Sequence, residues 1–312
     1  MKYKKRRFVP GECMHIYQRA VKGFNIFYEL EDYLVFFMIF STVAKSYDVT
    51  VMQLCIMVNH VHLLLSSAKL DQVSAFIMHY TSVFAREYNN DIGRRGPLFH
   101  KSFGSAPKSG SKSIRSTIVY IGNNPVEKDM CVSADGYKWN FLSYMDRKKR
   151  GVRIPLRELS HPLRRAVKVV NGMHSRNAYV TYTQLRQLMS RLSETERDAL
   201  ADHIIMTYYP FDTEALFGFY DSYGDMLTAM RSTAGSEYEI KEMYSPEPDT
   251  VYAKMSEVLR TECADMIDGQ VKKVLVAKPD DKFHVAQILR QKTRASVYQI
   301  SRFLHMPIVR AK

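Results

Sequence analysis

The segment Val58–Leu65 reads VNHVHLLL and decides how the first half of the chain folds. Its apolar residues predict a strand over Val61–Ser66, entered through a tight turn or bulge at Asn59 and His60. Side chains two residues apart share one face of a strand, so His60 and His62 are expected to point the same way. Two adjacent imidazoles indicate a metal or phosphate site that needs a third ligand. The pattern also fits two strand histidines that are hydrogen-bonded to their neighbours.

Turn residues and hydrophobic periodicity around this strand predict alternating strands and helices. The strands are expected over Met14–Val21, Val49–Val58, Val61–Ser66 and Leu98–Ala106, and the helices over Tyr33–Ser46, Asp71–Asn89 and Ser113–Asn123, the last ended by Pro125. The order β-α-β-β-α-β followed by a helix is the split βαβ, ferredoxin-like pattern. The predicted fold class is therefore α+β, with residues 1–150 as one domain.

The second half of the chain has a helical character that begins after the charge run Asp146–Arg150. An amphipathic pattern covers Leu185–His203, and a capping-box signal at Ser193–Glu196 inside it indicates two helices. The stretch Ser245–Asp249 is expected to be a linker or a helix start. Residues 151–270 are thus predicted to be a helical region, which could serve for dimerisation or as a spacer.

The last segment, residues 271–312, has the pattern of a helix-turn-helix. Two short helices are expected within Phe283–Met306, joined near Thr293–Ser296, with Ser296 capping the second and with Gln299 and Arg302 pointing outward. The segment is similar to the helix-turn-helix of the replication initiator's C-terminal domain. The chain stops at Lys312, where a further helix is expected, so the module is predicted to be incomplete. An ordinary helical hairpin has the same pattern.

The composition indicates a globular protein, because 46% of the 312 residues are hydrophobic. The four cysteines show no CxxC or CxxH spacing, which argues against a zinc ribbon or a disulfide framework and fits a reducing compartment. The basic N-terminus lacks the apolar core of a signal peptide, and the most apolar run, Tyr33–Ala44, is too short to span a bilayer. We therefore expect a cytoplasmic protein with no membrane partner.

The net charge of +13 is unevenly distributed along the chain. Residues 1–150 carry +10, residues 151–190 carry +6, residues 191–270 carry −11 and residues 271–312 carry +8. A polyanionic partner is therefore expected to meet the N-terminal half and the C-terminal segment, and not the acidic middle.

A second chemical feature lies in the predicted helix before Pro125. Tyr120 and Asn124 are four residues apart, so both project from one helical face. A phenol beside an amide oxygen that ligates a hard cation is the arrangement that a phosphotyrosine-forming nuclease needs, because the metal polarises the phosphate that the phenol attacks. Alternatively, Tyr120 packs in the core and Asn124 caps the helix.

Four stretches together resemble, in order and spacing, the IS200-like family of single-tyrosine transposases, specifically its REP-associated tyrosine transposase branch. They are Val58–Leu65, Gly96–Phe99, Tyr120–Val126 (YIGNNPV) and Tyr137–Tyr144 (YKWNFLSY). The resemblance covers about residues 8–145. It implies that the α+β domain is an HUH endonuclease, so named for its His-hydrophobic-His pair.

The resemblance also implies a site and partners. His60 and His62 match the metal pair, Asn124 matches the third ligand of a Mg²⁺ or Mn²⁺ ion, and Tyr120 matches the nucleophile that leaves a 5′-phosphotyrosine and a free 3′-OH. Family members act as dimers on single-stranded hairpins formed by palindromic repeats. Relatives can carry the tyrosine on a helix supplied by the partner subunit. The chain departs from the family at Gly122 and Asn123, where a histidine and an apolar residue are usual; Gly122 is expected to loosen the helix.

Basic residues near the candidate site and in the C-terminal segment are expected to contact DNA phosphates. Near the site they are interleaved with Phe99 and Phe103, whose rings could stack on bases. The candidates are Arg94, Arg95, Lys101, Arg115, Arg290, Lys292, Arg294 and Arg302.

The sequence leaves one main alternative to an active transposase, a catalytically idle DNA-binding protein or regulator that keeps the fold. The presence of His60, His62 and Tyr120 favours the enzyme. A histidine phosphoesterase needs two separate His-x-Ser/Thr motifs, whereas this chain has one His-x-His.

Overall fold

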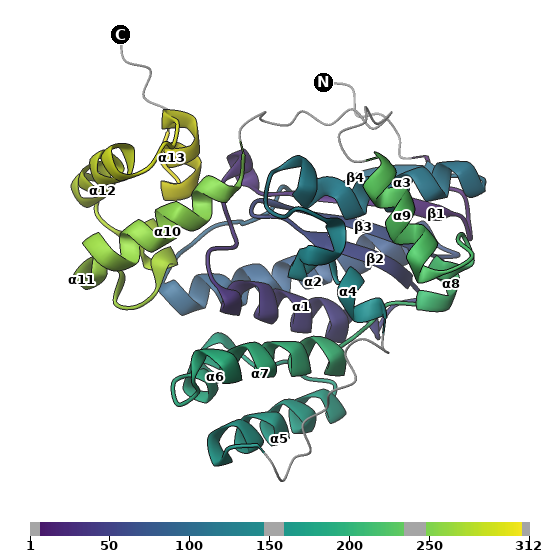
Figure 1. The fold of residues 1–312 in the computed structure, drawn as a ribbon, viewed down its shortest axis with the longest axis horizontal. Coiled ribbons are helices and arrows are strands. Elements are labelled where there is room, and N and C mark those ends of the chain that lie inside the picture. The colour runs from purple at the N-terminus through teal and green to yellow at the C-terminus, as the bar shows by residue number, and fades with distance from the viewer. Residues whose placement is uncertain (1–6, 147–158, 234–247, 308–312) are drawn as a thin grey trace.

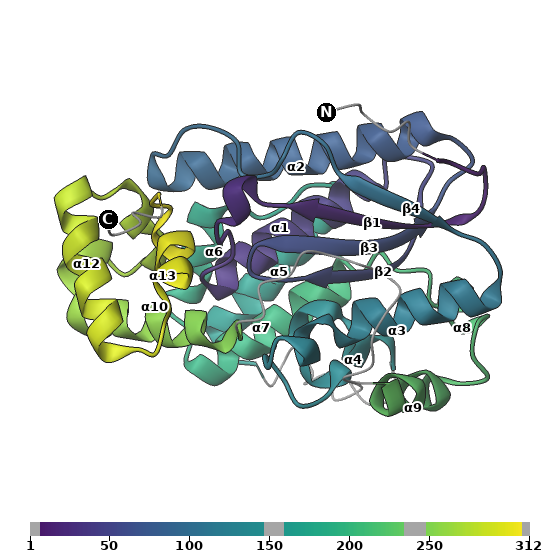
Figure 2. The same cartoon turned by 90° about the horizontal axis from the view of Figure 1, so that it is seen from above.

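The computed structural model describes residues 7–146, 159–233 and 248–307. Its first part contains the strands β1 (Cys13–Arg19), β2 (Thr50–Ile56), β3 (His60–Ser66) and β4 (Gly104–Lys108), and the helices α1 (Leu30–Ala44), α2 (Leu70–Ile92) and α3 (Ser111–Glu127). The strands form one antiparallel sheet in the order β2-β3-β1-β4 (Figures 1 and 2). This order with these connections is the ferredoxin-like arrangement, so the predicted α+β class is confirmed.

The predicted elements are present with boundaries shifted by a few residues, and two boundaries differ most. The fourth strand begins at Gly104 and not at Leu98; before it, only Phe99 makes an isolated bridge, with Ala20. The apolar signal there reflects burial of Leu98 and Phe99 in the core. Helix α3 also continues through Pro125 to Glu127. A proline removes one backbone hydrogen bond from a helix and clashes with the carbonyl one turn before it. Pro125 lies in the last turn of α3, so the helix ends soon after it.

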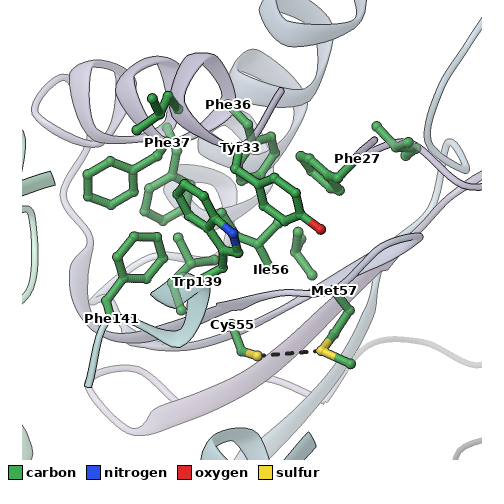
Figure 3. Packing of buried hydrophobic residues seen from close by; sticks show 14 of the residues in the cluster. Phe27, Tyr33, Phe36, Phe37, Cys55, Ile56, Met57, Trp139 and Phe141 are labelled. Carbon is green, nitrogen blue, oxygen red and sulfur yellow. Dashed lines mark hydrogen bonds between the residues drawn. The ribbon is translucent and has the colours of Figure 1, made fainter. Parts of the chain in front are cut away.

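The two faces of the sheet are covered differently. Helices α1 and α2 pack together on one face, and α3 lies on the other (Figures 1 and 2). An aromatic core fills the space between α1 and the sheet, where Trp139 stacks on Tyr33 with ring centroids 4.5 Å apart and Phe141 stacks on Phe37 at 4.4 Å (Figure 3). Trp139 and Phe141 follow α3 in sequence, so the chain crosses from one face to the other around the β2 edge.

The remaining helices surround this sheet. Helices α5 (His161–Ser175), α6 (Tyr182–Met189) and α7 (Glu194–Thr207) form a layer below α1, whereas α8 (Thr213–Phe217) and α9 (Tyr223–Thr233) lie beside α3 (Figure 1). At one end lie α10 (Thr250–Glu262), α11 (Ala264–Ile267), the 3₁₀ segment η5 (Val271–Val276), α12 (Pro279–Lys292) and α13 (Val297–Leu304). The short elements η1 (Val21–Gly23), η2 (Ala134–Gly136), η3 (Lys138–Asn140) and α4 (Leu142–Met145) complete the described chain.

Helix caps confirm several expectations. Capping boxes at Ser193 and Ser296 begin α7 and α13, so the two helix breaks predicted near these residues are present. Asp249 precedes α10, which supports the helix start expected there. Residues 147–150 of the predicted charge run and residues 245–247 lie outside the described residues. Among the helices in the described ranges, none is long and apolar enough to cross a membrane.

A buried ion-pair network joins the helical region to the sheet domain. The ammonium of Lys272 in η5, 1% exposed, lies 2.7 Å from Asp32 Oδ1 of α1 and 2.8 Å from Asp91 Oδ2 of α2. The hydroxyl of Tyr182 in α6 donates to Asp32 Oδ1 at 2.9 Å, and Lys272 Nζ lies 3.4 Å from the centre of the Tyr182 ring. Arg186 of α6 pairs with Asp91 as well. One ammonium therefore holds elements from four parts of the chain together.

Replacing Lys272 with methionine leaves Asp32 and Asp91 buried without their shared cation, so the variant is expected to lose about 3–5 kcal/mol of unfolding free energy. Urea denaturation followed by circular dichroism measures the loss. The matched control is Lys273→Met, because Lys273 pairs with the exposed Asp268 and its loss should leave the midpoint unchanged. Equal midpoints for the two variants would contradict the role assigned to Lys272.

Candidate active site

The sheet register gathers the candidate residues on the face that α3 covers. Arg19 of β1 lies opposite His60 of β3, and Tyr17 lies opposite His62. Because alternate residues share a face, His15 and both predicted histidines point the same way. Gly104 of β4 makes room beside them, since a Cβ at this position would fall 1.9 Å from the Tyr17 ring. His60 belongs to strand β3 and does not lie in a turn before it.

Helix α3 brings Tyr120 onto this face. Gln53 Nε2 of β2 donates to the carbonyl of Ile118 at 3.2 Å, which fixes the helix over the sheet. The Tyr120 ring then meets the rings of His62 and His15 edge-on, with centroids 5.7 and 5.6 Å apart. The tyrosine thus lies against the histidines of its own chain.

Asn124 completes the same cluster from the next turn of α3. Its Nδ2 donates to the carbonyl of Tyr120 at 3.0 Å, and its side chain is hydrogen-bonded to His62. The alternative role for Asn124, a helix cap before Pro125, is wrong because α3 runs on to Glu127. All four residues of the predicted site therefore meet, and each is at most 6% exposed.

His15 is a residue of this cluster that the sequence motifs did not reveal. Its Nε2 lies 3.1 Å from His62 Nδ1, and the two rings stack with centroids 5.3 Å apart. The contact between the two imidazoles orients the His62 ring, whose other side-chain partner is Asn124. The sequence signal was the alternation of His15, Tyr17 and Arg19 in β1, which gains meaning only once the register against β3 is known.

Hydrogen bonds fix the tautomer of His60. Asn59 Nδ2 donates to the carbonyl of Gly23 at 3.3 Å, so its Oδ1 accepts from His60 Nδ1, 2.6 Å away. Nε2 of the neutral imidazole then carries the electron pair. Burial lowers the pKa of His60 well below its usual value, with further lowering by His62, Arg19, Lys128 and Arg302. Burial likewise lowers the pKa of His62 to about 3. Both imidazoles are therefore neutral at neutral pH.

The donor set fits a divalent cation. Two neutral imidazoles whose ring centroids are 4.8 Å apart, together with the Asn124 amide, supply two nitrogens and one oxygen, a set that suits Mn²⁺ at least as well as Mg²⁺. In the described ranges no three His, Cys, Asp or Glu side chains are grouped to hold a metal ion.

The two unusual residues Gly122 and Asn123 have a packing explanation. A Cβ at Gly122 would lie 2.6 Å from Met230 Cε of α9. Asn123 Nδ2 donates to the Met230 carbonyl at 2.8 Å. The absence of a side chain at Gly122 thus lets α9 pack closely on the tyrosine-bearing helix, which holds that helix and does not loosen it.

The candidate DNA-binding residues lie in two groups. Arg94 is committed to its own loop, because its guanidinium donates to Asn89 Oδ1 and to the carbonyls of Gly96 and Pro97. The exposed members are Arg95, Lys101, Arg115, Arg290, Lys292 and Arg294, of which Lys292 pairs with Glu262. Phe99 and Phe103 are buried, so the expectation that these rings stack on bases is wrong.

The C-terminal helices follow the predicted boundaries, with one difference. Helices α12 and α13 are joined at Thr293–Ser296. Gln299 does not point outward: it is 5% exposed, and its Nε2 donates to the carbonyl of Pro248 at 2.9 Å. Arg302 is half-buried against the sheet domain. The face expected to read DNA is therefore partly covered.

Comparison with known proteins finds a similarity over part of this chain. Residues 24–124 match the family model "Transposase IS200 like". The resemblance seen in the sequence motifs is confirmed. No curated protein matches the chain. A solved structure described as "Structure of the REP associates tyrosine transposase bound to a REP hairpin" is 13% identical and covers 48% of this chain and 87% of its own, with a TM-score of 0.42.

Changing His15 to alanine should weaken Mn²⁺ binding about 10- to 100-fold, because His62 loses the partner that orients its ring. Isothermal titration calorimetry with MnCl₂ measures this directly, without DNA. His79→Ala, which alters an exposed histidine, is the control and should bind as the unmutated protein does. Unchanged affinity in the His15 variant would remove His15 from the site.

The buried histidines predict a loss of stability in acid without metal. The unfolded chain binds protons near pH 6.5, whereas the folded pKa of His62 is about 3 and that of His60 is also lowered. Stability should therefore be full above pH 6.5 and fall between pH 6.5 and 3, by up to about 1.4 kcal/mol per pH unit for each histidine. Urea unfolding between pH 7 and 4.5 should show a shallower fall for the His60→Gln/His62→Gln protein than for His161→Gln, which changes an exposed histidine.

Proposed function

We propose that the chain is a metal-dependent single-tyrosine transposase that cuts and rejoins single-stranded or hairpin DNA. The observation that carries this proposal is the contact of the Tyr120 ring with His62, a residue that is itself hydrogen-bonded to Asn124. A nucleophile, two neutral imidazoles and an amide oxygen meet in one buried cluster. The family match over residues 24–124 supports the same chemistry.

His60, His62 and Asn124 would hold Mg²⁺ or Mn²⁺, which when bound polarises the scissile phosphate. The phenol oxygen of Tyr120 forms a bond to phosphorus, and the bond from phosphorus to the 3′ oxygen breaks. The phenol gives up its proton and the leaving 3′ oxygen takes one up, so the products are a 5′-phosphotyrosine and a strand with a free 3′-OH. Attack of a 3′-OH on the phosphotyrosine reverses the bonds and rejoins DNA.

Burial of the cluster constrains how DNA enters. Tyr120 is 5% exposed and His62 is fully buried, so a phosphate reaches them only when a covering element moves. Helix α3 is held by α9 through Gly122 and Asn123, and the two helices would therefore move as a unit. Exclusion of water from the closed site would strengthen the electrostatic interactions there.

The wider DNA contacts extend the proposal. Residues 1–150 would form the catalytic domain, with Arg95, Lys101 and Arg115 contacting phosphates. Residues 151–270 would form a separate helical region, and residues 271–312 would bind DNA through Arg290, Lys292, Arg294 and Arg302. We further propose a homodimer in which each chain uses its own tyrosine, since Tyr120 already contacts the histidines of its own chain.

A Tyr120→Phe protein should form no covalent adduct with labelled hairpin DNA in the presence of Mn²⁺, because the attacking oxygen is gone. The adduct of the unmutated protein is detected as a labelled band in a denaturing gel. Tyr47→Phe removes a hydroxyl bonded to His79, between α1 and α2, and should leave the yield unchanged.

Two outcomes would go against the proposal. An adduct that persists in the Tyr120→Phe protein would assign the nucleophile elsewhere. Tight binding of hairpin DNA by the unmutated protein without any adduct in Mn²⁺ or Mg²⁺ would favour the idle DNA-binding protein.

A further inference from the structure

Three cations from distant parts of the chain surround His60. Arg19 lies directly opposite it in the sheet. Lys128 caps the end of α3, one turn beyond Asn124, and is 8% exposed. Arg302 comes from α13, near the end of the chain. The positive charges of all three act on the His60 imidazole.

Arg302 reaches this position through Gly23. The Nη2 atom of Arg302 lies 2.9 Å from where a Cβ of Gly23 would be, so the guanidinium occupies the space that a side chain would fill. The carbonyl of Gly23 accepts from Asn59, which in turn binds His60. Two residues thus connect the C-terminal helix to a candidate metal ligand.

Helix α13 is anchored around Arg302. The amide of Asn25 donates to the Arg302 carbonyl at 3.2 Å, and the hydroxyl of Tyr28 donates to the Phe303 carbonyl at 2.5 Å. His305 Nε2 donates to the Asn25 carbonyl at 2.6 Å. A helix bound on this side to the loop after β1 cannot place Arg302 in a DNA groove as a free recognition helix does.

A carboxylate lies against two of the three cations. The amide of Asp249 donates to the Lys128 carbonyl at 3.1 Å. Burial raises the pKa of the Asp249 carboxyl to about 6, while the charges of Lys128 and Arg302 oppose the rise. The charges of Lys128 and Arg302 therefore favour a negative charge at this place. A phosphodiester carries the same single negative charge and accepts hydrogen bonds from the same donors.

We propose that Arg302, together with Arg19 and Lys128, binds a backbone phosphate of the DNA strand that enters the catalytic centre. Helix α13 is then a wall of that centre and not a separate reader of DNA sequence. This inference rests on the proposed function, because it takes the ligand of the centre to be DNA. The proposed contact depends on charge and shape, so DNA binding through Arg302 is expected to be independent of base sequence.

The test measures binding and not cleavage. In the Tyr120→Phe background, a hairpin oligonucleotide with a single-stranded flank is titrated over a range of NaCl concentrations. Arg302→Gln should weaken binding on the order of tenfold and lower the salt slope by about 0.7, the value for one phosphate contact to a single strand. Arg302→Lys should recover most of the slope, because it keeps the charge.

A methylphosphonate scan locates the contact. Each flank phosphate is replaced in turn by the uncharged methylphosphonate. At one position, this replacement should weaken DNA binding by the protein with Arg302 and leave binding by the Arg302→Gln protein unchanged. The exposed Arg191, between α6 and α7, is the control; with Arg191→Gln, the loss at that position should persist in full. The unfolding midpoints show that each variant is folded.

The outcomes separate the two proposals. The role of Arg302 would be overturned if the protein with Arg302 and the Arg302→Gln protein bound DNA with equal affinity and salt slope. It would also be overturned if, at every phosphate, the methylphosphonate weakened DNA binding by the same factor in both proteins. Absence of a tyrosine–DNA adduct with the unmutated protein would instead overturn the proposed reaction, and the phosphate contact would still be measured by binding.

Discussion

The buried ammonium of Lys272 is the interaction on which the arrangement of this chain depends. A cation taken out of water is stable only when it is fully paired, and Lys272 finds Asp32 and Asp91 on the two helices that cover one face of the sheet. The phenol of Tyr182 adds a hydrogen bond to one carboxylate and a ring face to the cation. The network fixes α1, α2, α6 and η5 relative to one another. It therefore also fixes where α12 and α13 begin.

The candidate site depends on that placement from the other side of the sheet. The histidines come from β1 and β3, the tyrosine and the asparagine from α3, and the third cation from α13. The two helices are held by contacts outside the site: α3 by Gln53 and by α9, and α13 by Asn25 and Tyr28. The side chains of the candidate site are thus held in place by residues outside it.

Local patterns predicted what local geometry controls. Strand alternation was enough to put His60 and His62 on one face, and a spacing of four was enough to put Tyr120 beside Asn124. His15 was missed because its contact with His62 depends on the register between two strands 47 residues apart. The start of β4 was misplaced because Leu98 and Phe99 are buried in the core without belonging to a strand. The pattern of apolar residues is the same for a buried loop and for a strand. The packing of α9 on Gly122 joins segments more than a hundred residues apart, beyond the reach of any local signal.

The distance in sequence between Lys272 and its partners has a consequence during synthesis. Lys272 follows Asp32 by 240 residues, which at 5–20 residues per second corresponds to roughly 12–48 s of translation. During that interval Asp32 and Asp91 have left the ribosome without the cation that compensates their burial. The arrangement of α1, α2, α6 and η5 therefore reaches its full stability only after Lys272 has been made.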